Sequence, residues 1–193
     1  HYLEDLPMND SVVQVIADYE GNLWFASTRR GVMKLVANRF TDLFKRYQLP
    51  DRVVNTTCMY QNKLFVGTDT GLLVLDENGP VSDIPVTEVK TASGKDLQCE
   101  DLLSLLDGTR IRSVTKDSKN RLWFATTRSL GLVRYDRGTV MVFGADDGLF
   151  SNQTRIVHET MDGSFLVVCT GGLNIIRDDR VVGGYGQADG ISN

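Results

Sequence analysis

The sequence predicts an all-β fold made of four copies of one repeat. The stretch at residues 117–135, DSKNRLWFATTRSLGLVRY, recurs almost intact at 18–35 as DYEGNLWFASTRRGVMKL, and weaker copies lie at 62–75 and 162–176. Each copy has a polar turn, an apolar run, a small hydroxyl-rich segment, a glycine and a second apolar run. This order is typical of short strands joined by tight turns.

Two columns of residues set the register of the four copies. The column in the apolar run is Trp24, Phe65, Trp123 and Leu166. The column after it is Gly31, Gly71, Gly131 and Gly172. Both columns separate neighbouring copies by about 42 residues, with about 16 additional residues in the middle interval. The repeats are therefore placed at 8–50, 51–107, 108–150 and 151–193, with the insertion at 90–107.

Four strands are predicted in each repeat from β-branched and aromatic runs bounded by turn residues. In the first repeat they are 11–17, 22–27, 32–36 and 39–47. In the second they are 53–60, 63–68, 71–75 and 81–86. In the third they are 111–116, 121–126, 132–136 and 139–143, and in the fourth 154–159, 164–169, 173–177 and 181–185. The leucine-rich insertion fits either a short helical turn or an extended excursion.

Four short strands in about 42 residues, without a long helix, predict a β-propeller in which each repeat is one four-stranded antiparallel blade. Neighbouring blades pack face to face, and large aromatic side chains fill the space between them. We therefore expect Trp24, Phe65, Trp123 and Leu166 to be buried between blades, as structural residues and not as ligand platforms.

The tract D-x-x-G-x-L-W-F-A-S-T-x-x-G-V at residues 18–32 resembles the repeat of the two-component regulator propeller family. Residues 117–132 are similar, with Asn120 in the glycine position, while Gln61 and Asn62 replace the acidic turn in the second repeat. The resemblance extends over nearly the whole chain. It implies a fragment of the extracytoplasmic sensory region of a bacterial membrane receptor, either a two-component sensor kinase or a diguanylate cyclase, that responds to a small-molecule signal such as a carbohydrate or metabolite.

The composition is that of a globular domain with an ordinary surface. The 193 residues are 41% hydrophobic and 24% charged, with a formal net charge of −4. Scattered basic residues and a negative net charge disfavour nucleic-acid binding. No apolar run approaches the roughly 18 residues of a membrane-spanning helix, so we expect no membrane contact from this part of the protein. Cys58, Cys99 and Cys169 show no paired spacing and are interpreted mainly as small buried hydrophobic residues.

Catalytic chemistry has little support in the sequence. The histidines are His1 and His158, too few for a histidine-based metal or acid–base cluster. The adjacent acidic pairs at 100–101, 146–147 and 178–179 lie in expected turns or in the insertion, where solvated charge is the usual explanation. We therefore predict no metal, no cofactor and no enzymatic activity. The alternatives are a carbohydrate-active propeller hydrolase or lyase and a scaffold for protein contacts.

Three arginines are the predicted ligand-binding residues. Arg29, Arg30 and Arg128 follow the second strand in equivalent turns, so we expect them to share one face of the blades. Guanidinium groups suit carboxylates, phosphates and sugar hydroxyls. The alternative interpretation is that these arginines are solvated turn residues or ion-pair partners of neighbouring blades.

The chain is expected to be part of a longer propeller, because the repeat chemistry continues to its last residues. A partial propeller leaves apolar faces on its terminal blades, and such faces promote association. We therefore expect contacts with further blades of the parent protein, and a homo-oligomer when the fragment is isolated. The competing expectation is a closed four-blade ring, in which strand 11–17 packs on the last repeat.

Overall fold

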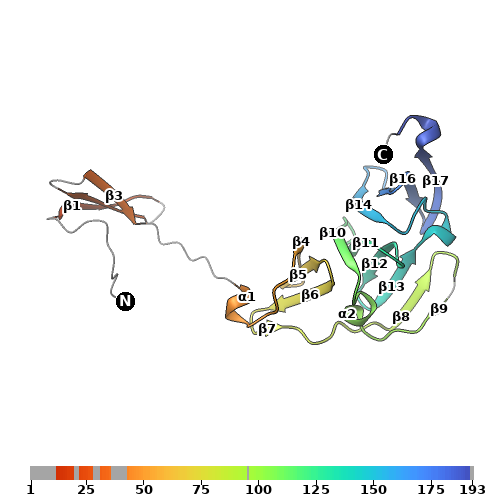
Figure 1. Cartoon of the computed structure of the whole chain (residues 1–193), viewed down its shortest axis with the longest axis horizontal. Coiled ribbons are helices and arrows are strands. Elements are labelled where there is room, and N and C mark those ends of the chain that lie inside the picture. Colours follow the sequence, from red (N-terminus) through yellow and green to blue (C-terminus); the bar gives the residue numbers. More distant parts are fainter. Residues whose placement is uncertain (1–11, 20–21, 28–30, 36–42, 95, 192–193) are drawn as a thin grey trace. The chain divides into compact units, whose positions relative to one another are not determined.

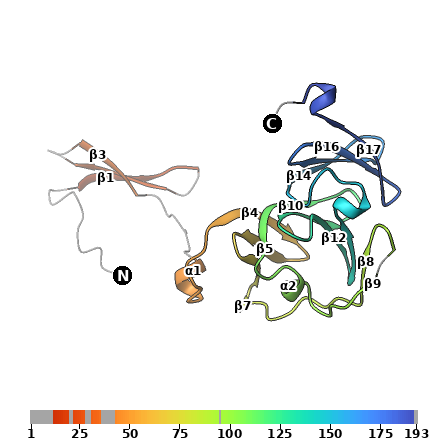
Figure 2. The same cartoon turned by 45° about the vertical axis from the view of Figure 1, so that its right-hand side comes forward.

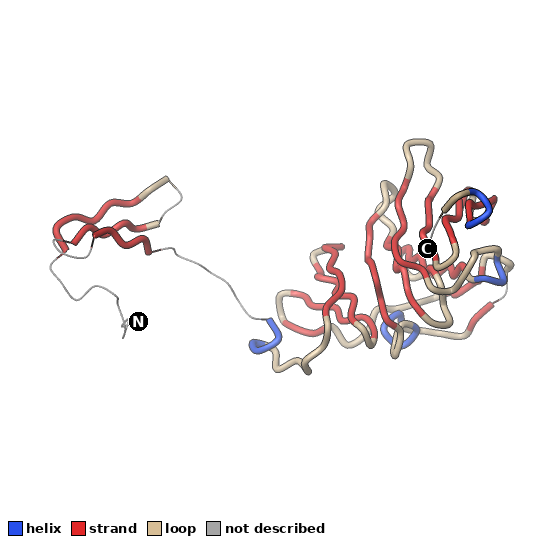
Figure 3. The backbone as a smooth tube through the Cα atoms, turned by 45° about the horizontal axis from the view of Figure 1, so that its top comes forward, coloured by secondary structure: helices blue, strands red, loops and turns tan. Residues whose placement is uncertain are grey.

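The computed structural model describes residues 12–19, 22–27, 31–35, 43–94 and 96–191. It divides into two units, His1–Arg46 and Tyr47–Asn193, each considered by itself below. Strands dominate the described residues of both units, and the helices are single short turns (Figure 3).

The first unit contains blade 1, a three-stranded antiparallel sheet in the order β1 (Val12–Ala17), β2 (Leu23–Ser27) and β3 (Gly31–Leu35). The fourth strand predicted at 39–47 is wrong where it can be examined, because Leu43–Arg46 forms the helix α1. Residues 39–42 lie outside the described residues. The sequence Leu-Phe-Lys-Arg has no β-branched residue, and its two cations lie at the end of the helix, where the helix dipole favours positive charge.

Blade 2 opens the second unit and consists of β4 (Val54–Tyr60), β5 (Lys63–Thr68), β6 (Gly71–Asp76) and β7 (Gly79–Pro80). The outer strand predicted at 81–86 is wrong, because the fourth strand is the two-residue β7. Pro80 and Pro85 lack the N–H that a continued ladder needs. Ile84 and Val86 are each only 6% exposed, so the apolar alternation in this stretch reflects burial and not strand pairing.

The insertion combines both predicted possibilities. It contains β8 (Glu88–Thr91), β9 (Asp96–Leu97) and the helical turn α2 (Leu102–Leu105). The Asp101 carboxylate caps α2 by accepting hydrogen bonds from the backbone N–H groups of Leu103 and Ser104. Strand β8 pairs in parallel with the outer strand of blade 3, a pairing that an all-antiparallel repeat does not predict.

Blades 3 and 4 each have the four predicted strands. Blade 3 comprises β10 (Arg110–Lys116), β11 (Leu122–Thr127), β12 (Leu132–Asp136) and β13 (Thr139–Phe143), and β8 and β9 extend it to six strands. Blade 4 comprises β14 (Thr154–Glu159), β15 (Phe165–Cys169), β16 (Gly172–Arg177) and β17 (Arg180–Gly186). The short 3-10 turns η1 (Ala145–Asp147) and η2 (Gln187–Asp189) follow the last strands of the two blades.

The first ladder of every blade is interrupted by one bulged residue. The register shifts between Val12 and Gln14, between Val54 and Thr56, between Ile111 and Ser113, and between Thr154 and Ile156. The bulged residues are therefore Val13, Asn55, Arg112 and Arg155. In every blade the residue three positions after the bulge is the ladder partner of Trp24, Phe65, Trp123 or Leu166, so the sequence register is also the structural register.

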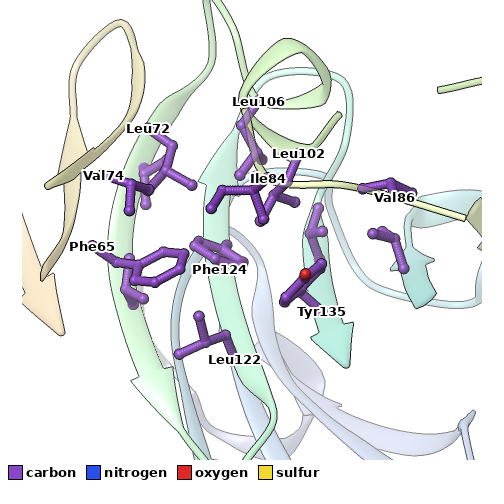
Figure 4. Close-up of a cluster of buried hydrophobic side chains, with 14 of the residues drawn as sticks. Phe65, Leu72, Val74, Ile84, Val86, Leu102, Leu106, Leu122, Phe124 and Tyr135 are labelled. Atoms are coloured by element: carbon purple, nitrogen blue, oxygen red, sulfur yellow. The ribbon is translucent and has the colours of Figure 1, made fainter. Parts of the chain in front are cut away.

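The core of the second unit lies in two seams, where neighbouring blades face each other (Figures 1 and 2). Seam 2–3, between blades 2 and 3, contains Phe65 and Phe124 with their ring centroids 6.5 Å apart (Figure 4). Seam 3–4, between blades 3 and 4, contains Trp123 and Phe165 with their centroids 4.3 Å apart. Strands β4, β10 and β14 are the innermost strands, and β10 contacts both of the others.

The four residues of the aromatic column differ in their surroundings. Phe65 and Trp123 are each 1% exposed, each at the seam between its own blade and the following one. Leu166, predicted to be buried, is only half-buried, because it faces away from blade 3 and no described sheet of its unit covers that side. Trp24 is half-buried in the first unit.

Candidate functional site

The acidic residue of the repeat holds the tryptophan in place. Asp117 Oδ2 accepts a hydrogen bond from Trp123 Nε1 at 2.8 Å, and Asp18 Oδ2 accepts one from Trp24 Nε1 at 2.9 Å. Each carboxylate also accepts the backbone N–H four residues ahead, from Arg121 and Asn22 respectively. The Asp side chain thus caps its turn and fixes the indole, which is a structural role repeated in two blades.

The pKa of Asp117 reflects this arrangement. Burial alone would raise the pKa, but hydrogen bonds from the Trp123 indole and from the backbone and guanidinium of Arg121 hold it below its usual value. The carboxylate is therefore ionised at neutral pH. A carboxylate so fully used by its own blade is a poor candidate for an acid–base group.

Two arginines flank Trp123 inside seam 3–4. Their guanidinium carbons lie 5.8 Å (Arg121) and 5.5 Å (Arg134) from the indole centroid, within the range of cation–π attraction. Arg134 also donates two hydrogen bonds to the carboxylate of Asp179 in blade 4. The Arg134 guanidinium lowers the pKa of Asp179, so this contact between blades is a charged one at neutral pH.

We call the start of each innermost strand, together with the turn after the second strand, the inner-strand rim. In seam 2–3 it contains Asn55, Asp69 and Arg110. In seam 2–3 the charges of this rim are paired. The Asp69 carboxylate lies 2.8 Å from Arg110 Nε in an ion pair whose angle does not make it a hydrogen bond. The same carboxylate accepts a hydrogen bond from Asn55 Nδ2 at 2.8 Å, and Asn55 also donates to the Ile111 carbonyl. The turn carboxylate thus accepts a hydrogen bond from the bulged residue and neutralises the arginine of the next blade, although Arg110 Nε itself has no hydrogen-bond partner.

The same positions in seam 3–4 carry a different set of residues. The bulged residue is Arg112 in place of Asn55, Thr127 replaces Asp69, and Gln153 replaces Arg110. Arg112 Nε is buried and has no hydrogen-bond partner, and no ion pair holds this guanidinium among the described residues. The rim of seam 3–4 therefore has a cation where the rim of seam 2–3 has a neutral amide, and no carboxylate in the turn position.

Of the three predicted ligand-binding arginines, one can be examined. Arg128 follows β11 with a positive φ of 116°, and its Nη1 donates to the Gly108 carbonyl at 2.7 Å. Its side chain is exposed. Arg29 and Arg30 lie outside the described residues, so the predicted cluster of the three remains a prediction.

Sequence reasoning missed Arg112 and Arg155. Arg128 was selected because it lies next to the glycine turn, whereas Arg112 and Arg155 lie within β10 and β14. The sequences of these two strands contain no feature that marks a binding residue. The alignment of the first strands was nevertheless available, because Val13, Asn55, Arg112 and Arg155 each lie five residues before the junction of their strand with the turn that follows it. Comparing the four residues in that column would have found two arginines in successive blades.

Other candidate residues show structural surroundings. Burial raises the pKa of the Cys169 thiol to about 11, which leaves it unreactive at neutral pH. No group of three or more metal-ligating side chains occurs in the part of the chain that the structure describes. Asp178 and Asp179, one of the adjacent acidic pairs, occupy the turn before β17, where Asp179 binds Arg134. No helix among the described residues is long and apolar enough to span a membrane.

Comparisons with known proteins place the repeat in a family. Two similar structures come from B. thetaiotaomicron and are described as the extracellular domain of BT4673, in one case as a hybrid two component system and in the other as a one component system. The first is 17% identical with a TM-score of 0.52 and covers 99% of this chain and 27% of that chain. The second is 16% identical with a TM-score of 0.50 and covers 94% and 25%.

A third structure, the extracellular domain of the hybrid two component system BT3049 from the same organism, is 17% identical with a TM-score of 0.44 and covers 94% of this chain and 29% of that chain. The chain thus spans between a quarter and a third of the length of these proteins. No curated protein matches the sequence. Residues 105–128, which contain β10 and β11 of blade 3, match the family described as two component regulator propeller. The chain is therefore a partial β-propeller that carries a repeat of this family.

Proposed function

We propose that the chain is part of the extracytoplasmic sensory propeller of a bacterial membrane receptor, that it binds a small-molecule signal, and that it performs no catalysis itself. The observation that carries the proposal is the two component regulator propeller match at 105–128, in the blade whose sheet and seams are most complete. The similarity in fold to extracellular domains of two component systems supports the same compartment.

The fixed geometry of the second unit also supports a binding role. Side chains in both seams are held by buried aromatic contacts and by hydrogen bonds between blades, such as those from Ser118 to Glu159. Loops and turns at the ends of such rigid sheets are positioned to recognise a ligand without a large loss of conformational freedom. A change in ligand occupancy at a seam would then alter contacts between whole blades.

The experiment is made on the full-length parent receptor in a bacterial membrane. The propeller is expected to be accessible to protease only from outside the cytoplasm, and output activity, measured as autophosphorylation or as cyclic diguanylate formation, is expected to depend on an added small molecule. A parent without any signalling output, or a purified chain that cleaves glycans at a measurable rate, would contradict the proposal. The second outcome would favour the hydrolase or lyase alternative.

We also propose that the outer face of blade 4 is covered in solution, by a second copy when the 193-residue chain is isolated. Ile156, Val182 and Tyr185 are 49%, 55% and 52% exposed, and a cavity of about 640 Å³ opens beside Val168 and Leu173. The corresponding side of blade 3 is closed by blade 4, so this face repeats a surface that is otherwise buried. Sedimentation equilibrium is expected to show a dimer or larger species at micromolar concentration, and a stable monomer would refute the idea.

A further inference from the structure

We propose that Arg112 binds an oxyanion at the inner-strand rim of seam 3–4, and that this oxyanion is a carboxylate, sulfate or phosphate group of the signal molecule. The identification of the ligand as the signal rests on the proposed function above. The binding of the oxyanion does not, because it follows from the polar groups of the rim.

Seam 2–3 shows a rim in which the arginine is paired with a carboxylate. There a carboxylate, Asp69, contacts both the bulged Asn55 of its own blade and Arg110 of the next blade. The carboxylate lies in the turn after the second strand, next to the hydroxyl of Thr68 that bonds the Gly71 carbonyl. The rim of seam 2–3 therefore contains an oxyanion, and that oxyanion is the carboxylate of Asp69.

Seam 3–4 keeps the frame of that rim but lacks the oxyanion. Thr126 reproduces the role of Thr68 by donating from its hydroxyl to the Gly131 carbonyl. The following residue is Thr127 where blade 2 has Asp69, and the bulged residue is the cation Arg112. A buried N–H donor without an acceptor is unfavourable, and Arg112 Nε is such a donor. An external oxyanion in the Asp69 position would satisfy it.

Arg155 is the bulged residue of blade 4 and corresponds to Arg112 of blade 3. Its neighbour Thr154 contacts blade 3 across seam 3–4. The Thr154 hydroxyl accepts a hydrogen bond from the Thr126 backbone N–H at 2.8 Å and lies within donating distance of the Thr126 and Gly131 carbonyl oxygens. Thr126 is in turn the ladder partner of Ile111, which precedes Arg112. Arg155 is exposed and borders the cavity of about 640 Å³ beside Val168 and Leu173 on the outer face of blade 4, so it lies outside the rim of seam 3–4.

The chemistry of the Arg112 side chain selects the ligand class. A guanidinium presents planar, paired N–H donors that match carboxylate, sulfate and phosphate oxygens, and it stays charged at all physiological pH values. Asp69, the carboxylate of the rim in seam 2–3, is already engaged by Arg110 and Asn55. A neutral sugar would leave the positive charge of Arg112 uncompensated, so an anionic small molecule is favoured over a neutral one.

The test is isothermal titration calorimetry of the 193-residue chain in low-salt, chloride-free buffer. The probes are inorganic sulfate, inorganic phosphate, glucuronate and, as the neutral control, glucose. We expect binding of at least one anion and none of glucose. Arg112→Gln is expected to weaken binding by roughly tenfold or more, because a charge-assisted hydrogen bond is lost. Arg155→Gln is expected to change it little, because Arg155 borders the outer face of blade 4.

The matched control is Arg177→Gln, which removes an exposed arginine that pairs with Asp162 in blade 4. It is expected to bind the anion as the native chain does. Circular dichroism establishes that each variant retains the native sheet content. Equal loss of affinity in Arg112→Gln and Arg177→Gln would show that only net charge matters and would overturn the site, as would the absence of anion binding by the native chain. Anion binding without a signalling response of the full-length receptor would refute the sensory function but not the anion-binding site.

Discussion

Seam 2–3 and seam 3–4 join sheets of the same kind in the same register, yet they are stabilised by different chemistry. In seam 2–3 the interior is apolar, with Tyr60 packed edge-on against Phe65 at 5.7 Å, and the rim is neutralised by Asp69. In seam 3–4 the residue equivalent to Tyr60 is Asp117, which holds Trp123, and the ion pair of Arg134 with Asp179 joins the two blades. The apolar positions of the repeat therefore specify the blade, while its polar positions are free to differ between seams.

The largest expected effect is the loss of the aromatic residue of seam 3–4. Trp123→Ala removes a side chain that is 1% exposed and packs on Phe165 and Phe143, so we expect a loss of about 3–5 kcal/mol in the free energy of unfolding. Urea denaturation followed by circular dichroism measures it. Tyr19→Ala is the control, since Tyr19 is 97% exposed and its removal should change stability by less than about 0.5 kcal/mol. Similar values for both variants would contradict the account of seam 3–4.

Acid should weaken seam 3–4 selectively. The pKa values of Asp117 and Asp179 are lowered in the folded state, so their contribution to stability is fully present above the unfolded pKa of about 3.9 and is lost as pH falls through the folded values. We expect Asp117→Asn to cost about 1–3 kcal/mol at pH 7, because the Arg121 and Trp123 donors lose a charged acceptor. The penalty of the substitution should shrink below pH 4, as measured by urea denaturation at several pH values. A penalty that does not change with pH would show that the charge of Asp117 is unimportant.

A smaller effect is expected from the rim of seam 2–3. The Asp69 and Arg110 side chains are 34% and 36% exposed, so solvent screens their attraction, and Asp69→Asn is expected to cost no more than about 1 kcal/mol in low salt. The difference from the native chain should decrease as ionic strength rises. Thermal melts at two salt concentrations test this, and a penalty that grows with salt would exclude an electrostatic origin.

The smallest effect is expected at the exposed edge of seam 3–4. Ser118 donates from its backbone and its hydroxyl to Glu159, and both residues lie near solvent. Ser118→Ala removes only the hydroxyl contact, so we expect a change below about 0.5–1 kcal/mol. A loss as large as that of Trp123→Ala would mean that the seam depends on this edge and not on its aromatic interior.

The sequence predicted the blades well because it records apolar periodicity and turn chemistry directly. The column of Trp24, Phe65, Trp123 and Leu166 coincides with the ladder register, and the inner three strands of each described blade lie close to their expected bounds. The fourth strands were harder. Residues 81–86 alternate like a strand because Ile84 and Val86 are buried, although Ile84 donates its backbone N–H to the Asp101 side chain and not to a sheet.

The candidate site was less predictable, because it depends on pairings between repeats. Arg128 could be selected from its turn, but the contrast between Asn55 with Asp69 and Arg112 with Thr127 becomes visible only when the bulges and the seams are known. Likewise, nothing within the sequence of one repeat indicates that Asp179 reaches Arg134 in the preceding blade. Local patterns specify each sheet, whereas the chemistry between sheets requires their packing.

The most direct test of the central claim exchanges the rim residues of the two seams and measures the sulfate dependence of the melting temperature. Thr127→Asp gives seam 3–4 an internal carboxylate, so sulfate should no longer raise its melting temperature as it does for the native chain. Asp69→Thr removes the carboxylate of seam 2–3 and frees Arg110, so its melting temperature should rise more steeply with sulfate. Identical sulfate dependence in the native chain and in both variants would contradict the claim that an oxyanion completes the rim of seam 3–4.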